Sequence, residues 1–451
     1  MNARATPPQT PAEAKIAADY LGARLSLPGV AAVGAWRDNS FEAFMAAGLP
    51  TRRVEAWHYT DLKRALVEAL PIATPPAATS VLAQGARLAS LCPRIEDVDS
   101  LRVVLVDGHF IPALSDVARL PQGVTLRSLA DALVDGDARL IQALSAPGLG
   151  KGDAALSLNA AFMQGGFVLD IAAGVEVAHP IEVVSLSSGA APQAIYARSL
   201  VRLGAAAKLT LIEMEACDKD AFEQRNCALV CQVADDAALE HVFIVAELAA
   251  RSAHVAHLLV SLQARAAFNS FTLARGGGLV RRQVFLRFDG EYAKAQLAGA
   301  NLLKDRDHWD TTLIVEHVAP HCESREYFKS VLDGESTGVY QGKVIVAPGA
   351  QKTDGAMKSH AILLSDGATM NNKPELEIFA DDVVCGHGAT VAQLDEDQLF
   401  YAQARGLPKH EAEAMLLEAF VDEATDRIEN EPIRTHVVGL IGDWLAARRR
   451  A

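Results

Sequence analysis

The stretch Asp236 to Phe243 (DAALEHVF) combines a turn signal, small residues and an alternation of apolar and polar side chains. The same order recurs at Gly204 to Leu211 (GAAAKLTL) and at Asp289 to Leu297 (DGEYAKAQL). Alternation with a period of two is typical of a β-strand that buries one face. Repeated units of turn and strand predict a β-solenoid or a large sandwich, because stacked units bury a core that no single unit can bury.

Short apolar runs of this kind continue from about residue 155 to residue 394, with Gly, Asp and Asn between them as turn signals. Convincing helical periodicity is scarce over the same range. We therefore predict a mainly β core over residues 151–394.

The sequence on both sides of this core has helical patterns. Residues 1–150 predict a mixed, mainly helical region, with a helix over 12–29, helical sequence over 41–69 that is interrupted at Pro50-Thr51, and a short strand over 101–106. Residues 395–451 predict a C-terminal helical region with an acidic outer face. Its first long helix has five residues at the spacing of one buried stripe: Ala412, Met415, Leu416, Ala419 and Phe420.

The composition excludes several classes of protein. The 451 residues include 56 acidic and 42 basic side chains, a net charge of −14, which disfavours general binding to nucleic acid. No apolar run approaches the roughly 18 residues of a membrane span, and the polar start Met1 to Glu13 does not predict a signal peptide. Six scattered cysteines do not form a disulfide framework, so we expect thiols in a reducing cytoplasm.

No phosphate-binding loop is present, because the Gly-Lys pairs at 150–151 and 342–343 lack the upstream glycine and the following Ser or Thr. The chain is therefore not expected to hydrolyse ATP by itself. Cys385-Gly-His387 is the sharpest reactive pattern, because residues i and i+2 of an extended segment point to the same side. A thiol and an imidazole on one side can ligate iron, copper or zinc, and a nearby histidine can lower the pKa of a cysteine.

A second group of reactive side chains lies at His317, His321 and Cys322. All three residue types can ligate soft metals, but their spacing is not that of a familiar zinc site. A hydrogen-bonded turn that packs one coil on the next is the alternative, and the sequence favours it.

Several longer motifs resemble the SufB/SufD family. They are Gly338 to Gly355 (GVYQGKVIVAPGAQKTDG), Lys373 to Thr390 (KPELEIFADDVVCGHGAT), His317 to Lys329, Arg52 to Leu62, and Arg405-Gly406-Leu407 with Met415, Leu416 and Phe420. The motifs follow one another in the family's order over nearly the whole chain. Within the family, the length and the Trp57-His-Tyr-Thr motif resemble the SufD branch more than the SufB branch.

This resemblance implies a fold and a function. The fold would be a right-handed parallel β-helix between helical ends. The function would be that of a non-catalytic, cytoplasmic scaffold for iron–sulfur cluster assembly, without a stably bound cofactor. Its partners would be a SufB-like paralogue, with which it shares a transient iron–sulfur cluster, and a SufC-like ATPase. A homodimer in isolation is also implied, and neither nucleic acid nor a membrane is an expected partner.

The resemblance also implies roles for individual residues. His387, with Cys385 as the weaker candidate, would serve the assembling cluster at the SufB interface, and His387 would be a transient iron ligand. Asp381 and Asp382 would orient the imidazole or attract iron. The residues implied in docking the ATPase are Arg405, Gly406, Leu407, Met415, Leu416 and Phe420.

Two other functions remain open from the residues alone. One is a β-helix enzyme acting on carbohydrate, although such folds usually carry clustered carboxylates in a groove. The other is a self-contained zinc protein that uses the Cys-x-His pattern. Metal analysis of aerobically purified protein separates these functions from that of the scaffold, because stoichiometric zinc supports only the zinc protein.

Overall fold

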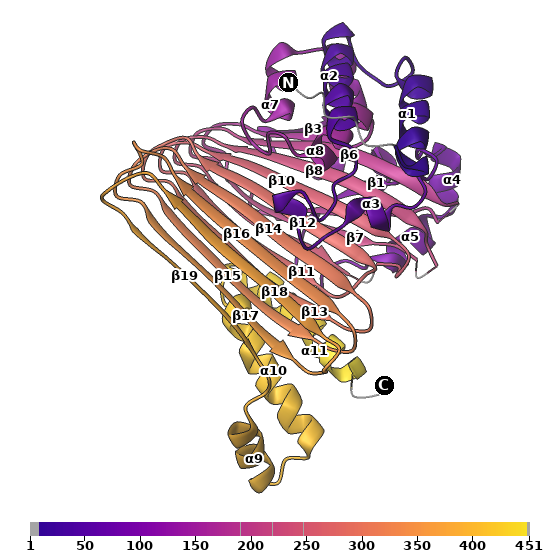
Figure 1. Ribbon diagram of the computed structural model, residues 1–451. Helices are drawn as coiled ribbons and strands as arrows, with labels where there is room; N and C mark the ends of the chain where they lie inside the picture. Colours follow the sequence, from indigo (N-terminus) through magenta and orange to yellow (C-terminus); the bar gives the residue numbers. More distant parts are fainter. Residues whose placement is uncertain (1–8, 190, 219, 247, 449–451) are drawn as a thin grey trace, which may run out of the picture.

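A computed structural model describes residues 9–448 except 190, 219 and 247, so most of the polar start at Met1 to Glu13 lies outside the described residues. Two sheets contain all 19 strands of the described residues, in the orders β19-β17-β15-β13-β11-β9-β7-β5-β1-β2 and β18-β16-β14-β12-β10-β8-β6-β4-β3. From β4 onward each strand pairs in parallel with the strand two positions along, so the chain winds alternately through both sheets (Figure 1). The predicted parallel β-helix core between helical ends is confirmed.

The strands have the following bounds. They are β1 (Leu101–Val106), β2 (His109–Phe110), β3 (Val124–Ser128), β4 (Phe167–Ile171), β5 (Ile181–Leu186), β6 (Gln193–Leu203), β7 (Lys208–Ala216), β8 (Glu223–Val233), β9 (Ala238–Val245), β10 (Ala253–Leu262), β11 (Ala267–Ala274), β12 (Leu279–Phe288), β13 (Lys294–Leu303), β14 (His308–His317), β15 (Glu323–Leu332), β16 (Thr337–Val346), β17 (Asp354–Leu363), β18 (Thr369–Ile378) and β19 (Val384–Ala392).

One corner of the solenoid explains the repeated turn signal. A non-glycine residue with positive φ stands just before each strand of the ten-stranded sheet from β7 to β17. These residues are Ala206, Asp236, Arg265, Tyr292, His321 and Lys352. The backbone N–H of each donates to a carbonyl of the next turn, as Ala206 N–H does to Asp235 O at 2.8 Å. The turn that the sequence predicted is thus a left-handed corner that joins neighbouring coils.

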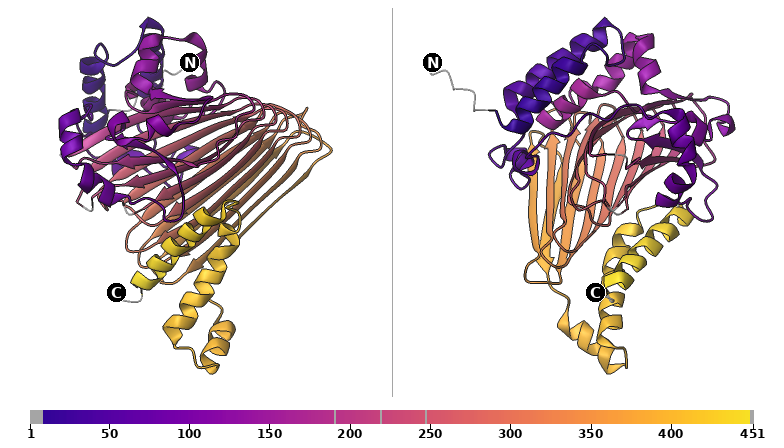
Figure 2. Two further views of the ribbon diagram at one scale, coloured as in Figure 1. Left: turned by 180° about the vertical axis from the view of Figure 1, so that it is seen from behind. Right: turned by 90° about the vertical axis from the view of Figure 1, so that its right-hand side faces the viewer.

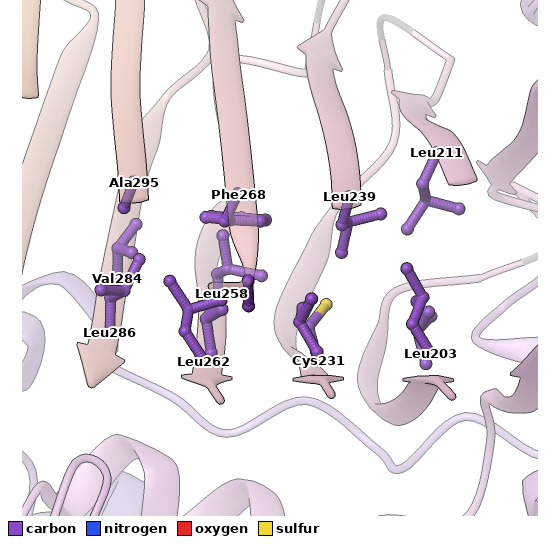
Figure 3. Close-up of a cluster of buried hydrophobic side chains, with 14 of the residues drawn as sticks. Leu203, Leu211, Cys231, Leu239, Leu258, Leu262, Phe268, Val284, Leu286 and Ala295 are labelled. Atoms are coloured by element: carbon purple, nitrogen blue, oxygen red, sulfur yellow. The ribbon is translucent and has the colours of Figure 1, made fainter. Parts of the chain in front are cut away.

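The solenoid core consists of alternate side chains from both sheets. Leu211 and Leu239 of the ten-stranded sheet face Leu203 and Cys231 of the nine-stranded sheet, and all four are buried (Figure 3). Because the strands are stacked in register, apolar side chains of successive coils lie above one another, as Leu239 does on Leu209 and Cys231 on Val201. Such a core removes apolar surface from water at roughly 25 cal/mol per Å².

Helices cover the first turns of the solenoid (Figure 2). They are α1 (Pro11–Ala23), α2 (Ala31–Ala47), α3 (Leu62–Ala65), α4 (Ala78–Ala83), α5 (Gly85–Leu91), α6 (Leu129–Asp135), α7 (Ala138–Ser145) and α8 (Ala154–Phe162), with the 3-10 helices η1 (Glu55–Trp57), η2 (Pro112–Leu114) and η3 (Val117–Arg119). The predicted strand 101–106 is confirmed as β1. Since β1 pairs with β5, the N-terminal region and the core share a sheet, and the boundary at residue 150 stays a prediction.

The predicted helical stretch over 41–69 is confirmed up to residue 47 in α2 and again over residues 62–65 in α3, and it is wrong between these two helices. Residues 52–60 instead cross the outer face of the nine-stranded sheet, where the Trp57 ring lies 4.0 Å from the Arg281 guanidinium and its indole N–H donates to Asp153. Thr60 hydrogen-bonds to the buried Asp310. Through these contacts Trp57 and Thr60 fix the N-terminal region to the core.

The C-terminal helices are α9 (Glu396–Ala404), α10 (Lys409–Thr425) and α11 (Glu431–Arg448). Helices α10 and α11 pack on the outer face of the ten-stranded sheet, and α9 projects away from it (Figure 2). The predicted apolar stripe is wrong in phase, because α10 buries Ala412, Ala414, Leu417, Val421 and Ala424. Three of these buried positions are alanines, so α10 can pack closely on its neighbours. Among the described residues, no helix has the length and hydropathy needed to cross a bilayer.

Candidate functional site at the open end of the solenoid

The last turn of the solenoid is uncovered. Strands β18 and β19 are the final strands of their sheets, and each has a strand neighbour on only one side. Several apolar side chains are exposed there, including Phe379 at 62%, Val384 at 72% and Val391 at 48%. An exposed edge presents unpaired backbone N–H and C=O groups, and such an edge is a template for pairing with another chain. We call β18, β19 and the connecting residues 379–383 the open end.

Cys385 and His387 both lie on β19, at positions that continue the interior columns. Cys385 stands in register with Gly355 of β17, and His387 with the buried Met357. The Cys385 side chain packs against the last core residues and is half-buried, whereas His387 is exposed. The alternation of the strand therefore brings the thiol and the imidazole to the same side, as the i, i+2 spacing predicted.

The electrostatics of this pair differ from the sequence-based prediction in two respects. Partial burial raises the pKa of Cys385, which is the opposite of the direction that the sequence predicted for a cysteine beside a histidine. Asp382 pairs with Lys352 at 2.5 Å rather than with His387. Among the described residues, no hydrogen bond or ion pair joins His387 to another side chain, and the imidazole is free to accept a ligand.

The segment 317–322 has a structural role. The buried His317 ring stacks on Phe288 at 4.3 Å, and its Nε2 lies 3.1 Å from the Ser324 hydroxyl. His321 is one of the left-handed corner residues, and the buried Cys322 thiol donates to Gly290 O at 3.3 Å. No group of three His, Cys, Asp or Glu side chains in the described part of the chain is arranged to hold a metal ion. These residues therefore pack one coil on the next.

The residues implied in docking the ATPase are divided between surface and core. Arg405, Gly406 and Met415 are exposed, with Met415 at 49%, whereas Leu407 and Leu416 are half-buried. Phe420 is also half-buried, because its ring lies 4.1 Å from the Lys329 ammonium and packs on the helix–sheet core. Gly406 has a φ of +94°, which a residue with a side chain rarely adopts, so it shapes the turn between α9 and α10.

Sequence reasoning missed two aromatic residues on α9. Phe400 is 73% exposed and Tyr401 is 60% exposed, with the Arg405 guanidinium 4.8 Å from the Tyr401 ring. Large apolar side chains on a projecting helix are typical anchors of protein interfaces. The sequence signal was present as a Leu-Phe-Tyr run in a short acidic helix.

Comparison with known proteins identifies the family. The SufBD core domain of the SUF system for FeS cluster assembly matches residues 185–420, and the SufBD protein N-terminal region matches residues 24–183. The chain belongs to the SufBD family. The core match covers the strands from β6 to β19 together with α9 and most of α10.

Individual SufBD relatives show the same likeness over most of the chain. The iron–sulfur cluster assembly protein SufD of Escherichia coli is 29% identical over 91% of this chain and 92% of its own length. The chloroplastic protein ABCI7 of Arabidopsis thaliana is 27% identical over 90% of this chain and 85% of its own length. The predicted likeness to SufD is confirmed, and this chain is a SufBD protein of the SUF system for iron–sulfur cluster assembly.

Proposed function

We propose that this chain is a non-catalytic scaffold subunit that assembles an iron–sulfur cluster together with a SufB-like paralogue. In this proposal the open end pairs with the paralogue, and the nascent cluster forms where the two chains meet. The cluster is cargo that both chains hold briefly and then release. ATP hydrolysis belongs to a SufC-like partner that docks on α9 and the start of α10.

The observation that carries the proposal is the position of His387. This imidazole is exposed, has no partner among the described residues and lies on a strand whose outer backbone edge is unpaired. Neutral imidazole and thiolate are both iron ligands in iron–sulfur centres. A ligand that is free in the isolated chain becomes useful when a second chain supplies the remaining ligands.

The edge-pairing part of the proposal is tested by a proline in β19. The Val384 N–H donates to Thr353 O, so the backbone N–H groups of 385, 387, 389 and 391 are directed outward by alternation. Ala389→Pro removes one outward donor without removing a hydrogen bond of the chain itself. We expect it to abolish co-purification of the SufB-like paralogue while the unfolding transition stays near that of the wild type.

The matched control is Ala389→Ser, which keeps the backbone donor and should retain the partner. Undiminished capture of the paralogue by Ala389→Pro would show that the partner does not pair with β19. The paralogue would then bind to the edge strand β18 or to a helical surface instead of β19.

The docking part of the proposal is tested on α9. Phe400→Ala removes a side chain that is 73% exposed, so the free energy of unfolding should change by less than about 0.5 kcal/mol. Because an aromatic anchor can contribute 2 kcal/mol or more to an interface, retention of the ATPase should fall at least about tenfold. Leu21→Ala, on the distant helix α1 and 64% exposed, is the control and should have no effect. Equal ATPase retention by both variants would remove α9 from the docking surface.

We also place the protein in a reducing cytoplasm. The support is that all six cysteines are free and that burial raises the pKa of several, including Cys92 and Cys227 to about 12. Thiols of this kind suit a compartment that keeps cysteines reduced. Stoichiometric zinc in aerobically purified protein would instead favour a zinc-binding function over the scaffold.

A further inference from the structure

The two strand edges of the open end differ in sequence. Strand β19, Val384–Ala392 (VCGHGATVA), contains no proline and none of the residues Asp, Glu, Lys and Arg. Strand β18 contains the charged residues Lys373, Glu375 and Glu377. Pro374 lies near the middle of the same strand. Proline and charged side chains on an edge strand are features by which proteins prevent pairing with another strand. The edge of β18 is therefore protected, whereas the edge of β19 is not.

The donor that Pro374 lacks would lie on the free side of β18. At the start of the strand the Thr369 N–H donates to Ser336 O, and just after its end the Phe379 N–H donates to Val346 O. Both acceptors belong to the preceding coil of the sheet, which contains β16. Because the backbone groups of successive residues point in opposite directions, odd-numbered residues of β18 bond to β16 and even-numbered residues face the free side. Pro374 therefore leaves the pairing with β16 intact and removes one outward donor.

A strand that paired with β18 would meet this gap in the middle of its ladder. By the same alternation, the outward N–H groups of β18 belong to Met370, Asn372, Leu376 and Ile378, on the two sides of Pro374. The partner carbonyl opposite Pro374 would have no donor, and the ring carbon bonded to the proline nitrogen would hold the partner backbone beyond hydrogen-bond distance. A carbonyl that loses water without gaining a donor costs free energy, so this pairing is disfavoured.

Ion pairs lie on β18 beside the same gap. The Lys373 ammonium lies 3.3 Å from the Glu375 carboxylate and also pairs with Glu55 of the N-terminal segment. The Glu377 carboxylate pairs with Lys343 of β16 at 2.6 Å. A strand laid along β18 would remove water from these charged groups without supplying a new partner for them. The charges and the proline thus act in the same direction.

The free edge of β19 has neither obstacle. Each of its outward residues, at 385, 387, 389 and 391, has a backbone N–H to donate. Gly386 and Gly388 alternate with them, and a Cβ atom at either glycine would meet no heavy atom of the described residues within 4 Å. The space beside this strand is therefore open, and a partner strand can approach β19 along its whole length.

We propose that the open end takes up a partner strand on one sheet only. The paralogue extends the ten-stranded sheet through β19, and Pro374 prevents extension of the nine-stranded sheet through β18. Pro374 is thus a specificity-determining residue that sets which ladder forms at this end. The inference rests on the proposed function for its consequence: the junction stays open on the side of β18, where iron and sulfide enter and the finished cluster leaves.

The test uses the isolated full chain with a second copy of itself as the pairing partner, so its result does not depend on the paralogue. Pro374→Ala restores the outward N–H and removes no hydrogen bond, so its unfolding temperature should stay near that of the wild type. Sedimentation velocity over a range of concentrations measures self-association. We expect Pro374→Ala to lower the dissociation constant at least about tenfold, because the whole edge of β18 can then pair. Pro374→Val, which fills more of the space of the ring, should have the same effect.

Hydrogen exchange locates the new contacts. The peptide 369–378 should gain protected amides as the concentration of Pro374→Ala rises, whereas the same peptide of the wild type should not. The matched control is Pro348→Ala, because Pro348 is exposed in the corner between β16 and β17 and its loss should leave self-association unchanged. Unchanged self-association of both variants at position 374, an equal gain in Pro348→Ala, or concentration-dependent protection of 369–378 in the wild type would each overturn the proposal.

Discussion

Leu286→Asp should lower the free energy of unfolding by roughly 5 kcal/mol or more and leave most of the protein insoluble. Leu286 lies on β12, is fully buried and stands in register with Val260 and Val315 in the solenoid core (Figure 3). The substitution removes about 2–3 kcal/mol of apolar burial and places a carboxylate without a partner between two coils. Because each coil contacts its neighbours, the damage should spread along the stack.

Urea unfolding and the soluble fraction after expression measure this effect. Leu286→Met is the matched control, since it conserves volume and should cost less than about 1.5 kcal/mol. An aspartate variant as soluble and cooperative as the methionine variant would show that Leu286 does not face the interior.

Asp310→Ala should destabilise the chain by about 3–5 kcal/mol, because it leaves the Arg281 guanidinium buried without its counter-charge. Both side chains of this ion pair are fully buried under residues 56–60. The Asp310 carboxylate also accepts from the Thr60 and Thr312 hydroxyls. We expect the loss to release the N-terminal segment first, and limited proteolysis near residue 60 should detect the release.

Glu55→Ala is the control for this second substitution. Glu55 belongs to the same segment and pairs with Lys373 of β18, but its side chain is exposed. Its removal should leave stability and proteolysis close to those of the wild type. If Asp310→Ala and Glu55→Ala behave alike, the buried ion pair does not fix the N-terminal segment to the solenoid.

The sequence predicted the solenoid well because its signals are local. The corner residue Asp236 and the alternating apolar and polar side chains of the following strand lie within ten residues of sequence. Successive coils repeat this pattern. The Cys385 and His387 positions were predicted for the same reason, since the i, i+2 relation depends only on the strand that carries them.

Features that depend on distant partners were not predicted. The loop at 52–60 looked helical, because its conformation is imposed by contacts with Arg281 and Asp310 of the core. The buried face of α10 was misplaced by about one residue, because small residues such as Ala414 and Ala424 are buried while Met415 is exposed.

The most direct test of the central claim is the iron and sulfide content of the assembled complex. The chain is co-expressed with the SufB-like paralogue and the SufC-like ATPase, purified anaerobically, and compared with His387→Ala and Cys385→Ser. We expect His387→Ala to keep both partners and the ATPase activity but to lose most of the acid-labile sulfide and bound iron, with a smaller loss for Cys385→Ser. A His387→Ala complex with the wild-type amounts of iron and sulfide would contradict the account, because the cluster would then be held wholly by the partner.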